Sequence, residues 1–402
     1  MPGLTPLTEA LDLVLTGVAP IDEKEECTLV DSLGRVLAEN AVSAVAVPND
    51  DNSAMDGYAL RSAECGQVLE VSQRIPAGAT GSELIPGTAA RIFTGAPVPP
   101  GADAVVMQEN CERDGDELRV LKPVDSGENI RPRGQDIQPG DSVLPAGRRL
   151  QGEDLGVLAS IGLARVPVVR RLVVAVLSTG DELVEPGTAE ELSHGQIFNS
   201  NRFTLQGLLA GLGMEVRDFG VVPDDPEATA QVLREAAAAA DCVISTGGVS
   251  VGEEDHVRNQ VEALGQLQLW KLRIKPGKPL AFGHVLETPF FGLPGNPAAV
   301  YVTFSLVVRP WLLARQGAEP SPPLGIVALA DFEQARAGSR EEYLRCRVES
   351  RDGELRAALH PNQSSGVLSS ISWANALAVV PPGVTVARGD MVTVYLLDQL
   401  NR

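Results

Sequence analysis

Three polar loops hold residues suited to chemistry, and each follows a short apolar run typical of a buried strand. They span residues 178–183 (STGDEL), 223–226 (PDDP) and 246–255 (TGGVSVGEED). Ligands of open parallel sheets bind beyond the carboxyl ends of the strands, so these loops are expected to meet at one edge. Paired glycines before a helix N-terminus suit a phosphate, with a tight turn as the alternative. The candidate phosphate-binding residues there are Gly247, Gly248 and Ser250.

Carboxylates recur in all three loops. Mg²⁺ commonly takes one or two protein carboxylates together with waters and substrate phosphates. Helix capping, for example by Asp225 or Glu253, explains any single acid equally well. Recurrence at three strand ends favours a metal and ligand site. The available acids are Asp181, Glu182, Asp224, Glu253, Glu254 and Asp255.

Positive charge is concentrated in one short segment, KLRIKPGKP at residues 271–279. The chain has 28 Arg but only five Lys, and Lys271, Lys275 and Lys278 all fall here. If residues 271, 273 and 275 lie in one strand, their side chains face the same side and three cations converge. An anion would offset their repulsion, so we predict oxyanion or phosphate binding. A solvated edge strand protected by lysines is the alternative.

The elements that position these loops alternate between strands and helices over residues 172–318. Apolar runs at 172–177, 214–222 and 242–245 predict strands. The stretches after Asp225 and Asp255 predict helices, as does the stretch that either Asn199 or Ser200 can cap. This alternation predicts right-handed βαβ units and a parallel α/β sheet domain.

Three further regions complete the predicted architecture. Residues 46–145 are rich in Gly, Pro and Asp and predict an inserted β-rich domain. Amphipathic helices at 5–17 and 152–161 flank it, so residues 1–45 and 146–171 are predicted to form one discontinuous helical domain. Residues 319–402 predict a C-terminal β-barrel domain.

Composition excludes several classes of protein. The formal net charge of −20 argues against nucleic-acid or anionic-membrane partners. Five widely spaced cysteines without a C-x-x-C pair predict reduced thiols and a cytoplasmic protein. The uncharged, apolar stretch at residues 289–308 is interrupted by Pro294, Gly295 and Pro297, so no membrane-spanning helix is expected. Scattered histidines argue against a histidine metal site.

Several motifs together resemble the molybdopterin molybdenumtransferases, the MoeA family that is also found in the C-terminal region of gephyrin. The motifs occur in the family's order along nearly the whole chain. They are DNSAMDGYAL (51–60), RIFTGAPVPPGADAVVMQE (91–109), GENIRPRGQDI (127–137), STGDEL, GQIFNSNR (195–202), STGGVSVGEEDH (245–256), KPGKPLAFG (275–283) and FGLPGNPAAVYVTF (291–304).

The resemblance implies a transferase of molybdenum cofactor biosynthesis. Such an enzyme inserts molybdate into adenylylated molybdopterin with release of AMP, uses Mg²⁺, and works as a homodimer with its active site at the subunit interface. Transient contacts with the molybdopterin adenylyltransferase and with acceptor molybdoenzymes are also expected. The alternatives are a molybdopterin adenylyltransferase and a dimeric scaffold of the gephyrin type. Nothing in the sequence distinguishes molybdate from tungstate.

The resemblance also assigns roles to individual residues. Positions matching the family's active site are Asp56, Thr94, Asp136, Glu182 and Asp255. Asp224 matches a substrate-binding position, with the adjacent Asp225 as the alternative counterpart. Lys271 and Lys275 match the family's basic residues, with Lys278 beside them. Glu182, Asp224 and Asp255 are the implied Mg²⁺ ligands.

Overall fold

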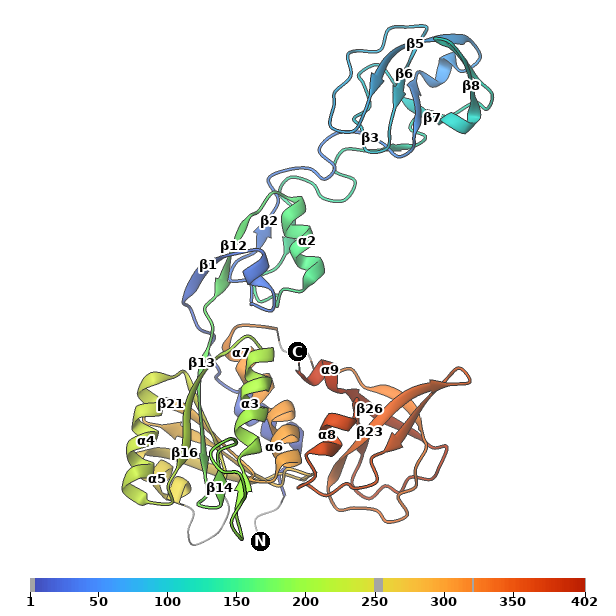
Figure 1. Cartoon of the computed structure of the whole chain (residues 1–402). Helices are drawn as coiled ribbons and strands as arrows, with labels where there is room; N and C mark the ends of the chain where they lie inside the picture. The colour runs from blue at the N-terminus through green and yellow to red at the C-terminus, as the bar shows by residue number, and fades with distance from the viewer. Residues whose placement is uncertain (1–3, 249–255, 320–321, 402) are drawn as a thin grey trace. The chain divides into compact units, whose positions relative to one another are not determined.

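A computed structural model describes residues 4–248, 256–319 and 322–401. The chain divides into two compact units (Figure 1). Unit 1 comprises residues 1–25, 34–36 and 168–402, and unit 2 comprises residues 26–33 and 37–167. This division is coarser than the four predicted domains, whose boundaries therefore remain a prediction. The chain passes between the units in β1 (Lys24–Thr28) and β12 (Arg165–Val169).

The central sheet of unit 1 has the strand order β16–β13–β17–β21–β20–β18. The first four strands are parallel, as the alternating pattern predicted. The last two pairings, β21 with β20 and β20 with β18, are antiparallel. Only two residues join β20 to β21, too few for a parallel crossover. The predicted parallel sheet is therefore present in the four neighbouring strands β16, β13, β17 and β21, whereas the pairings at the other edge are antiparallel. Their bounds are β13 (Val173–Thr179), β16 (Glu215–Val222), β17 (Cys242–Thr246), β18 (Gly265–Lys271), β20 (Pro279–Val285) and β21 (Thr288–Leu293).

Helices cover both faces of this sheet (Figure 1). On one face α4 (Pro226–Ala239) and α5 (His256–Leu264) pack Leu233 and Val261 onto Val243 of the sheet. On the other face lie α3 (Ser200–Gly211) and α6 (Pro297–Thr303). Asn199 caps α3, since its side chain accepts a hydrogen bond from the Arg202 N–H. The predicted starts of α3 and α4 are therefore confirmed.

One helical stretch, Pro297–Arg315, is long and apolar enough to cross a membrane by composition, and 83% of its most apolar window is buried inside the structure. That burial is typical of a core helix. The stretch Pro297–Arg315 consists of α6, the π-helical turn η4 (Phe304–Val308) and α7 (Arg309–Arg315). Helix α1 (Leu7–Leu15) packs beside it.

The C-terminal part of unit 1 is a closed barrel, as predicted. Its strands follow the order β23–β24–β22–β26–β25, and β25 pairs back with β23. Alanine and valine side chains such as Ala328, Ala357 and Val394 fill the interior. Two-residue β19 (Ile274–Lys275) pairs in parallel with the start of β23. The bounds are β22 (Ile326–Ala330), β23 (Glu341–Arg351), β24 (Glu354–Leu359), β25 (Ala376–Val380) and β26 (Met391–Leu396), with α8 (Ser369–Trp373) and α9 (Leu397–Asn401).

Unit 2 is built on a second mixed sheet, ordered β7–β4–β6–β5–β9–β8. Two apolar clusters pack around it, one with Tyr58 and Leu118, the other with Ile75 and Ile92. The β-rich character predicted for residues 46–145 is therefore present. The bounds are β4 (Gly57–Leu60), β5 (Val68–Ile75), β6 (Thr88–Ile92), β7 (Ala104–Met107), β8 (Cys111–Asp114) and β9 (Glu117–Val120), with short β2 (Ala41–Val42), β3 (Asn52–Ser53), β10 (Ile130–Arg131) and β11 (Ser142–Leu144), and α2 (Gly152–Ser160) after them.

Candidate active site

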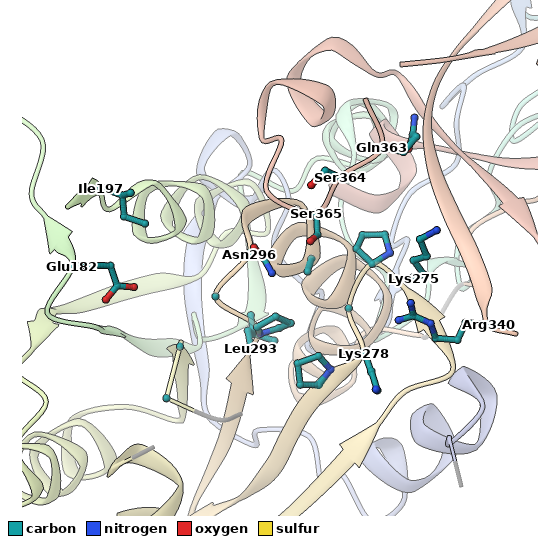
Figure 2. A pocket seen from close by; sticks show the side chains of 18 residues that line it. Glu182, Ile197, Lys275, Lys278, Leu293, Asn296, Arg340, Gln363, Ser364 and Ser365 are labelled. Carbon is teal, nitrogen blue, oxygen red and sulfur yellow. The ribbon is translucent and has the colours of Figure 1, made fainter. Parts of the chain in front are cut away.

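A cavity of about 730 Å³ opens in unit 1 beyond the carboxyl ends of β17 and β21. Figure 2 shows Glu182 and Ile197 on one side of it and Lys275, Lys278 and Arg340 on the other. The sheet and the barrel both contribute to its wall. The lining residues are Glu182, Ile197, Gly247, Gly248, Lys275, Pro276, Gly277, Lys278, Pro279, Leu293, Pro294, Gly295, Asn296, Ala299, Arg340, Gln363, Ser364 and Ser365.

Among the described residues, three cations line this cavity. Lys275 ends β19, Lys278 lies in the loop between β19 and β20, and Arg340 comes from the segment that leads into β23. The loop is held at both ends, because the Leu272 N–H donates to the Lys278 carbonyl at 2.7 Å and Arg340 Nη1 donates to the Ile274 carbonyl at 3.2 Å. Such a group of cations favours a small, highly charged anion.

Gly247 and Gly248 form the cavity wall at the end of β17. Both have positive φ values, +87° and +65°, which favour glycine. A Cβ on Gly247 would lie 2.7 Å from the Thr179 carbonyl oxygen, and one on Gly248 would lie 2.6 Å from Val257 Cγ2. Close packing against β13 and α5 therefore requires glycine at both positions. The Oγ1 atom of Thr179 is buried beside them without a hydrogen-bond partner among the described residues.

Glu182 is placed by a small two-stranded flap. β14 (Leu183–Val184) pairs in parallel with β15 (Ile197–Phe198), and the Ile197 N–H donates to the Glu182 carbonyl at 2.9 Å. Gly180 makes room for the carboxylate, since a Cβ there would lie 2.4 Å from Glu182 Oε2. The flap thus brings an exposed carboxylate into the cavity wall opposite the cations (Figure 2).

The barrel contributes a polar loop, Gln363, Ser364 and Ser365, that a buried arginine holds in place. Arg345 Nη2 donates to the Ser364 carbonyl at 3.0 Å, and its backbone N–H donates to Gln363 Oε1 at 2.9 Å. Burial lowers the pKa of the Arg345 guanidinium. The Ser364 and Ser365 hydroxyls are neutral donors that this loop can offer to an anion, whereas the Gln363 amide donates to the Arg345 and His360 carbonyls.

The two acids in the PDDP loop have different positions. Asp225 Oδ1 accepts from the Ala228 N–H at 2.8 Å and caps α4. Asp224 has an exposed side chain, and its N–H donates to Asp181 Oδ1 at 3.3 Å. Asp181 and Asp224 therefore meet at the ends of neighbouring strands β13 and β16. Among the described residues no group of three or more His, Cys, Asp or Glu could hold a metal ion.

The expected convergence of residues 271, 273 and 275 in one strand is wrong. β18 ends at Lys271, and β19 begins only at Ile274. Lys271 is exposed and is not among the lining residues of the cavity, whereas Arg273 donates from Nε to the Ser339 carbonyl at 3.1 Å. The strand is interrupted because Leu272 bonds to the loop and Arg273 pairs with the barrel.

Three predicted site residues lie in unit 2. Thr94 donates to Asp56 Oδ1 from its backbone N–H at 2.8 Å and from its hydroxyl at 2.9 Å. These hydrogen bonds, the backbone one foremost, lower the pKa of the exposed Asp56 carboxyl, and the nearby Arg91 adds to the effect. Asp136 is also exposed, and its N–H donates to the Val47 carbonyl at 3.0 Å.

Three family models match successive parts of the chain. They describe the MoeA N-terminal region (domain I and II) over residues 5–162, a probable molybdopterin binding domain over residues 175–314, and the MoeA C-terminal region (domain IV) over residues 328–397. A molybdopterin molybdenumtransferase of Haemophilus influenzae is 38% identical over 385 residues, covering 94% of this chain and 95% of that protein. The chain belongs to the MoeA family of molybdopterin molybdenumtransferases.

Other members of the MoeA family agree with this assignment. A molybdopterin molybdenumtransferase of Nostoc is 38% identical and covers 98% of this chain and 94% of its own length. The crystal structure of a molybdopterin biosynthesis moeA protein from Pyrococcus horikoshii has a TM-score of 0.84 at 32% identity, covering 98% of this chain and 100% of that one. The similarity therefore includes both the inserted module and the barrel, which argues against the adenylyltransferase alternative.

In this MoeA-family chain, some of the predicted site residues lie at one cavity and others lie elsewhere. The cavity brings together Glu182, Gly247, Gly248, Lys275 and Lys278. Asp224 lies beside Asp181, and Asp56, Thr94 and Asp136 lie in the other unit. Ser250 and Asp255 lie outside the described residues.

Sequence reasoning assigned no role to the cavity residues supplied by the barrel. These are Arg340, Gln363, Ser364 and Ser365. Two signals were available, the charged run GSREEY at 338–343 and the polar turn HPNQSS at 360–365. Neither has a spacing that distinguishes a ligand-binding loop from an ordinary turn.

Proposed function

We propose that this chain inserts molybdate into adenylylated molybdopterin and releases AMP, with the cavity of unit 1 as the site of the anionic groups. The observation that carries the proposal is the meeting of Lys275, Lys278 and Arg340 at one cavity in a chain of net charge −20. Molybdate is a small dianion, and the phosphoanhydride of the other substrate is also anionic. In an acidic chain, both need a local concentration of cations.

In this proposal the cavity residues bind and orient the reacting groups. The ammonium groups of Lys275 and Lys278 and the Arg340 guanidinium hold the oxyanion, and they stabilise charge that develops as the phosphoanhydride is cleaved. The hydroxyl groups of Ser364 and Ser365 supply hydrogen bonds that fix its orientation, and Gln363 holds their loop against the barrel. Gly247 and Gly248 let the phosphate approach the backbone closely. Glu182, across the cavity, is available to orient the water that attacks phosphorus.

We also propose that Mg²⁺ takes part, held by Asp224 with Asp181, by Glu182, and by Asp255. Asp181 and Asp224 suit this role, because both side chains are exposed and the Asp181 carboxylate contacts the Asp224 backbone N–H, and Mg²⁺ usually completes its shell with water and substrate phosphate oxygens. When bound, the ion would neutralise phosphate charge and polarise the phosphoryl group.

Further parts of the proposal come from resemblance to the family. We infer a homodimer in which Asp56, Thr94 and Asp136 complete the active site, a cytoplasmic location, and transient contacts with the molybdopterin adenylyltransferase and with acceptor molybdoenzymes. A gephyrin-type scaffold role has no supporting observation in this chain. Sedimentation velocity of the full chain tests the homodimer directly.

The function is tested by incubating the full chain with adenylylated molybdopterin, Mg²⁺ and molybdate. We expect AMP release that depends on molybdate, and a loss of about a hundredfold in Lys278→Ala/Arg340→Ala because two charged hydrogen bonds are removed. Lys122→Ala, an exposed lysine of unit 2, is the matched control and keeps full activity. AMP release without molybdate would falsify the proposal, and adenylylation of free molybdopterin with ATP would support the alternative.

A further inference from the structure

A buried carboxylate, that of Glu342, forms an ion pair with Lys275, one of the cations that line the cavity. Lys275 Nζ donates to Glu342 Oε2 at 3.1 Å. The Glu342 side chain is only 9% exposed, whereas that of Lys275 is 48% exposed. Lys275 lines the cavity, and Glu342 is absent from its described lining residues. The pair therefore joins a buried carboxylate to a half-exposed lysine that lines the cavity.

The backbone around Glu342 is fixed on both sides. Glu342 pairs with Lys275 of β19 in parallel and with Val380 of β25 in antiparallel register. The Glu341 N–H donates to the Arg273 carbonyl at 2.9 Å, and this hydrogen bond extends the pairing between β23 of the barrel and the β19 segment. Gly338 leaves room for the carboxylate, because a Cβ there would lie 2.5 Å from Glu342 Oε1. The barrel thus presents this carboxylate from a rigid strand.

We propose that Glu342 is a positioning residue for the oxyanion site, acting through Lys275. A lysine ammonium sits on a flexible stem of four carbons, and ordering it costs rotamer entropy. Glu342 occupies one of its three N–H donors and leaves two for oxyanion oxygens. The lysine is then ordered before the anion arrives, so less of the binding free energy is lost on ordering it. The inference rests on the proposed function, since it deepens the role of the same cavity.

Molybdate affinity of the full chain tests the inference by isothermal titration calorimetry. We expect Glu342→Ala to weaken molybdate binding about tenfold, through loss of a charged hydrogen bond to Lys275. In the insertion assay, KM for molybdate rises while KM for adenylylated molybdopterin stays near its wild-type value. Glu342→Gln keeps an oxygen acceptor and loses less affinity than Glu342→Ala, and it serves as the second variant if the alanine variant does not fold.

A double-mutant cycle separates positioning from a merely structural role. If Glu342 acts through Lys275, then Lys275→Ala/Glu342→Ala binds molybdate no more weakly than Lys275→Ala alone. Glu349→Ala is the matched control, because Glu349 lies on the same strand in an exposed pair with Arg351 and should leave affinity unchanged. Additive losses in the cycle, or equal effects on both substrates, overturn the inference.

The outcomes also separate this inference from the proposed function. If the wild-type chain binds no molybdate and releases no AMP, the proposed function is wrong. If the wild type binds molybdate and Lys275→Ala weakens that binding while Glu342→Ala does not, only the positioning role of Glu342 is wrong.

Discussion

At the residue scale, Asp56 accepts two hydrogen bonds from a single neighbour, and this makes its pKa adjustable by one substitution. Thr94→Ala removes the hydroxyl bond and keeps the backbone bond. We expect the lowered pKa of Asp56 to rise toward its ordinary value without reaching it, because the backbone donor is the larger cause. A pH titration of the Asp56 carboxyl carbon by NMR measures the shift, and Thr94→Ser should preserve the wild-type value.

The same pair shows how a pKa shift relates to function. Asp56 is exposed and remains ionised at neutral pH both in the wild type and in Thr94→Ala. A change in turnover in Thr94→Ala would therefore not result from a change in the charge of Asp56. A large loss of activity together with a small pKa change would mean that the Thr94 hydroxyl contacts substrate. An unchanged pKa in Thr94→Ala would contradict the hydrogen-bond explanation.

At the element scale, the start of α4 separates two adjacent acids that the sequence left ambiguous. Asp225 caps the helix, whereas Asp224 directs an exposed side chain toward solvent beside Asp181. Asp225→Ala should destabilise the first turn by about 1 kcal/mol through loss of the cap. Hydrogen exchange at the Ala228 amide, which donates to Asp225, should then become about fivefold faster.

Asp224→Ala is the matched comparison for that prediction. It removes no cap, so exchange at Ala228 should stay unchanged while AMP release falls if Asp224 binds Mg²⁺ or substrate. Faster exchange in Asp224→Ala with normal exchange in Asp225→Ala would reverse the two assignments. The pair of variants thus decides which aspartate is structural.

Local patterns predicted the elements of unit 1 better than their long-range contacts. Asp225 followed by Pro226 marks a helix start in the sequence, and the structure confirms it. Nothing within residues 271–279 reveals that Arg273 bonds to Ser339 or that β19 pairs with β23, so one continuous strand was expected. For the same reason Arg340 and Ser365 were missed, since their place in the cavity depends on barrel closure.

At the scale of the whole molecule, charge is distributed unevenly between surface and site. The chain carries 53 acidic and 33 basic residues, yet three cations meet at a cavity of about 730 Å³. The sequence showed this concentration for the lysines, because three of the five fall in one segment. It did not show the contribution of Arg340, which reaches the same cavity from a part of the chain more than sixty residues away.

The predicted insertion of residues 46–145 is also a whole-molecule property. Both apolar clusters of unit 2, around Tyr58 and around Ile92, draw only on residues within this range. Its two ends are tied together, because the Val47 N–H donates to the Ile137 carbonyl at 2.8 Å and the Gly134 N–H donates to the Pro48 carbonyl at 2.9 Å. A segment with its own core and joined ends should fold without the rest of the chain.

We therefore predict that residues 46–145, expressed alone, unfold cooperatively on heating and keep slowly exchanging amides in β4 and β6. The remaining chain, with residues 45 and 146 joined by a short glycine-serine linker, should retain the sheet and barrel of unit 1, whose cores contain no residue of the excised segment. It should still bind molybdate, because every described residue of the cavity lies outside 46–145. Its AMP release should be lost, because Asp56, Thr94 and Asp136 are removed with the module. A fragment whose amides all exchange within minutes would show that the module depends on its flanking helices, and the domain boundary would have to include α2.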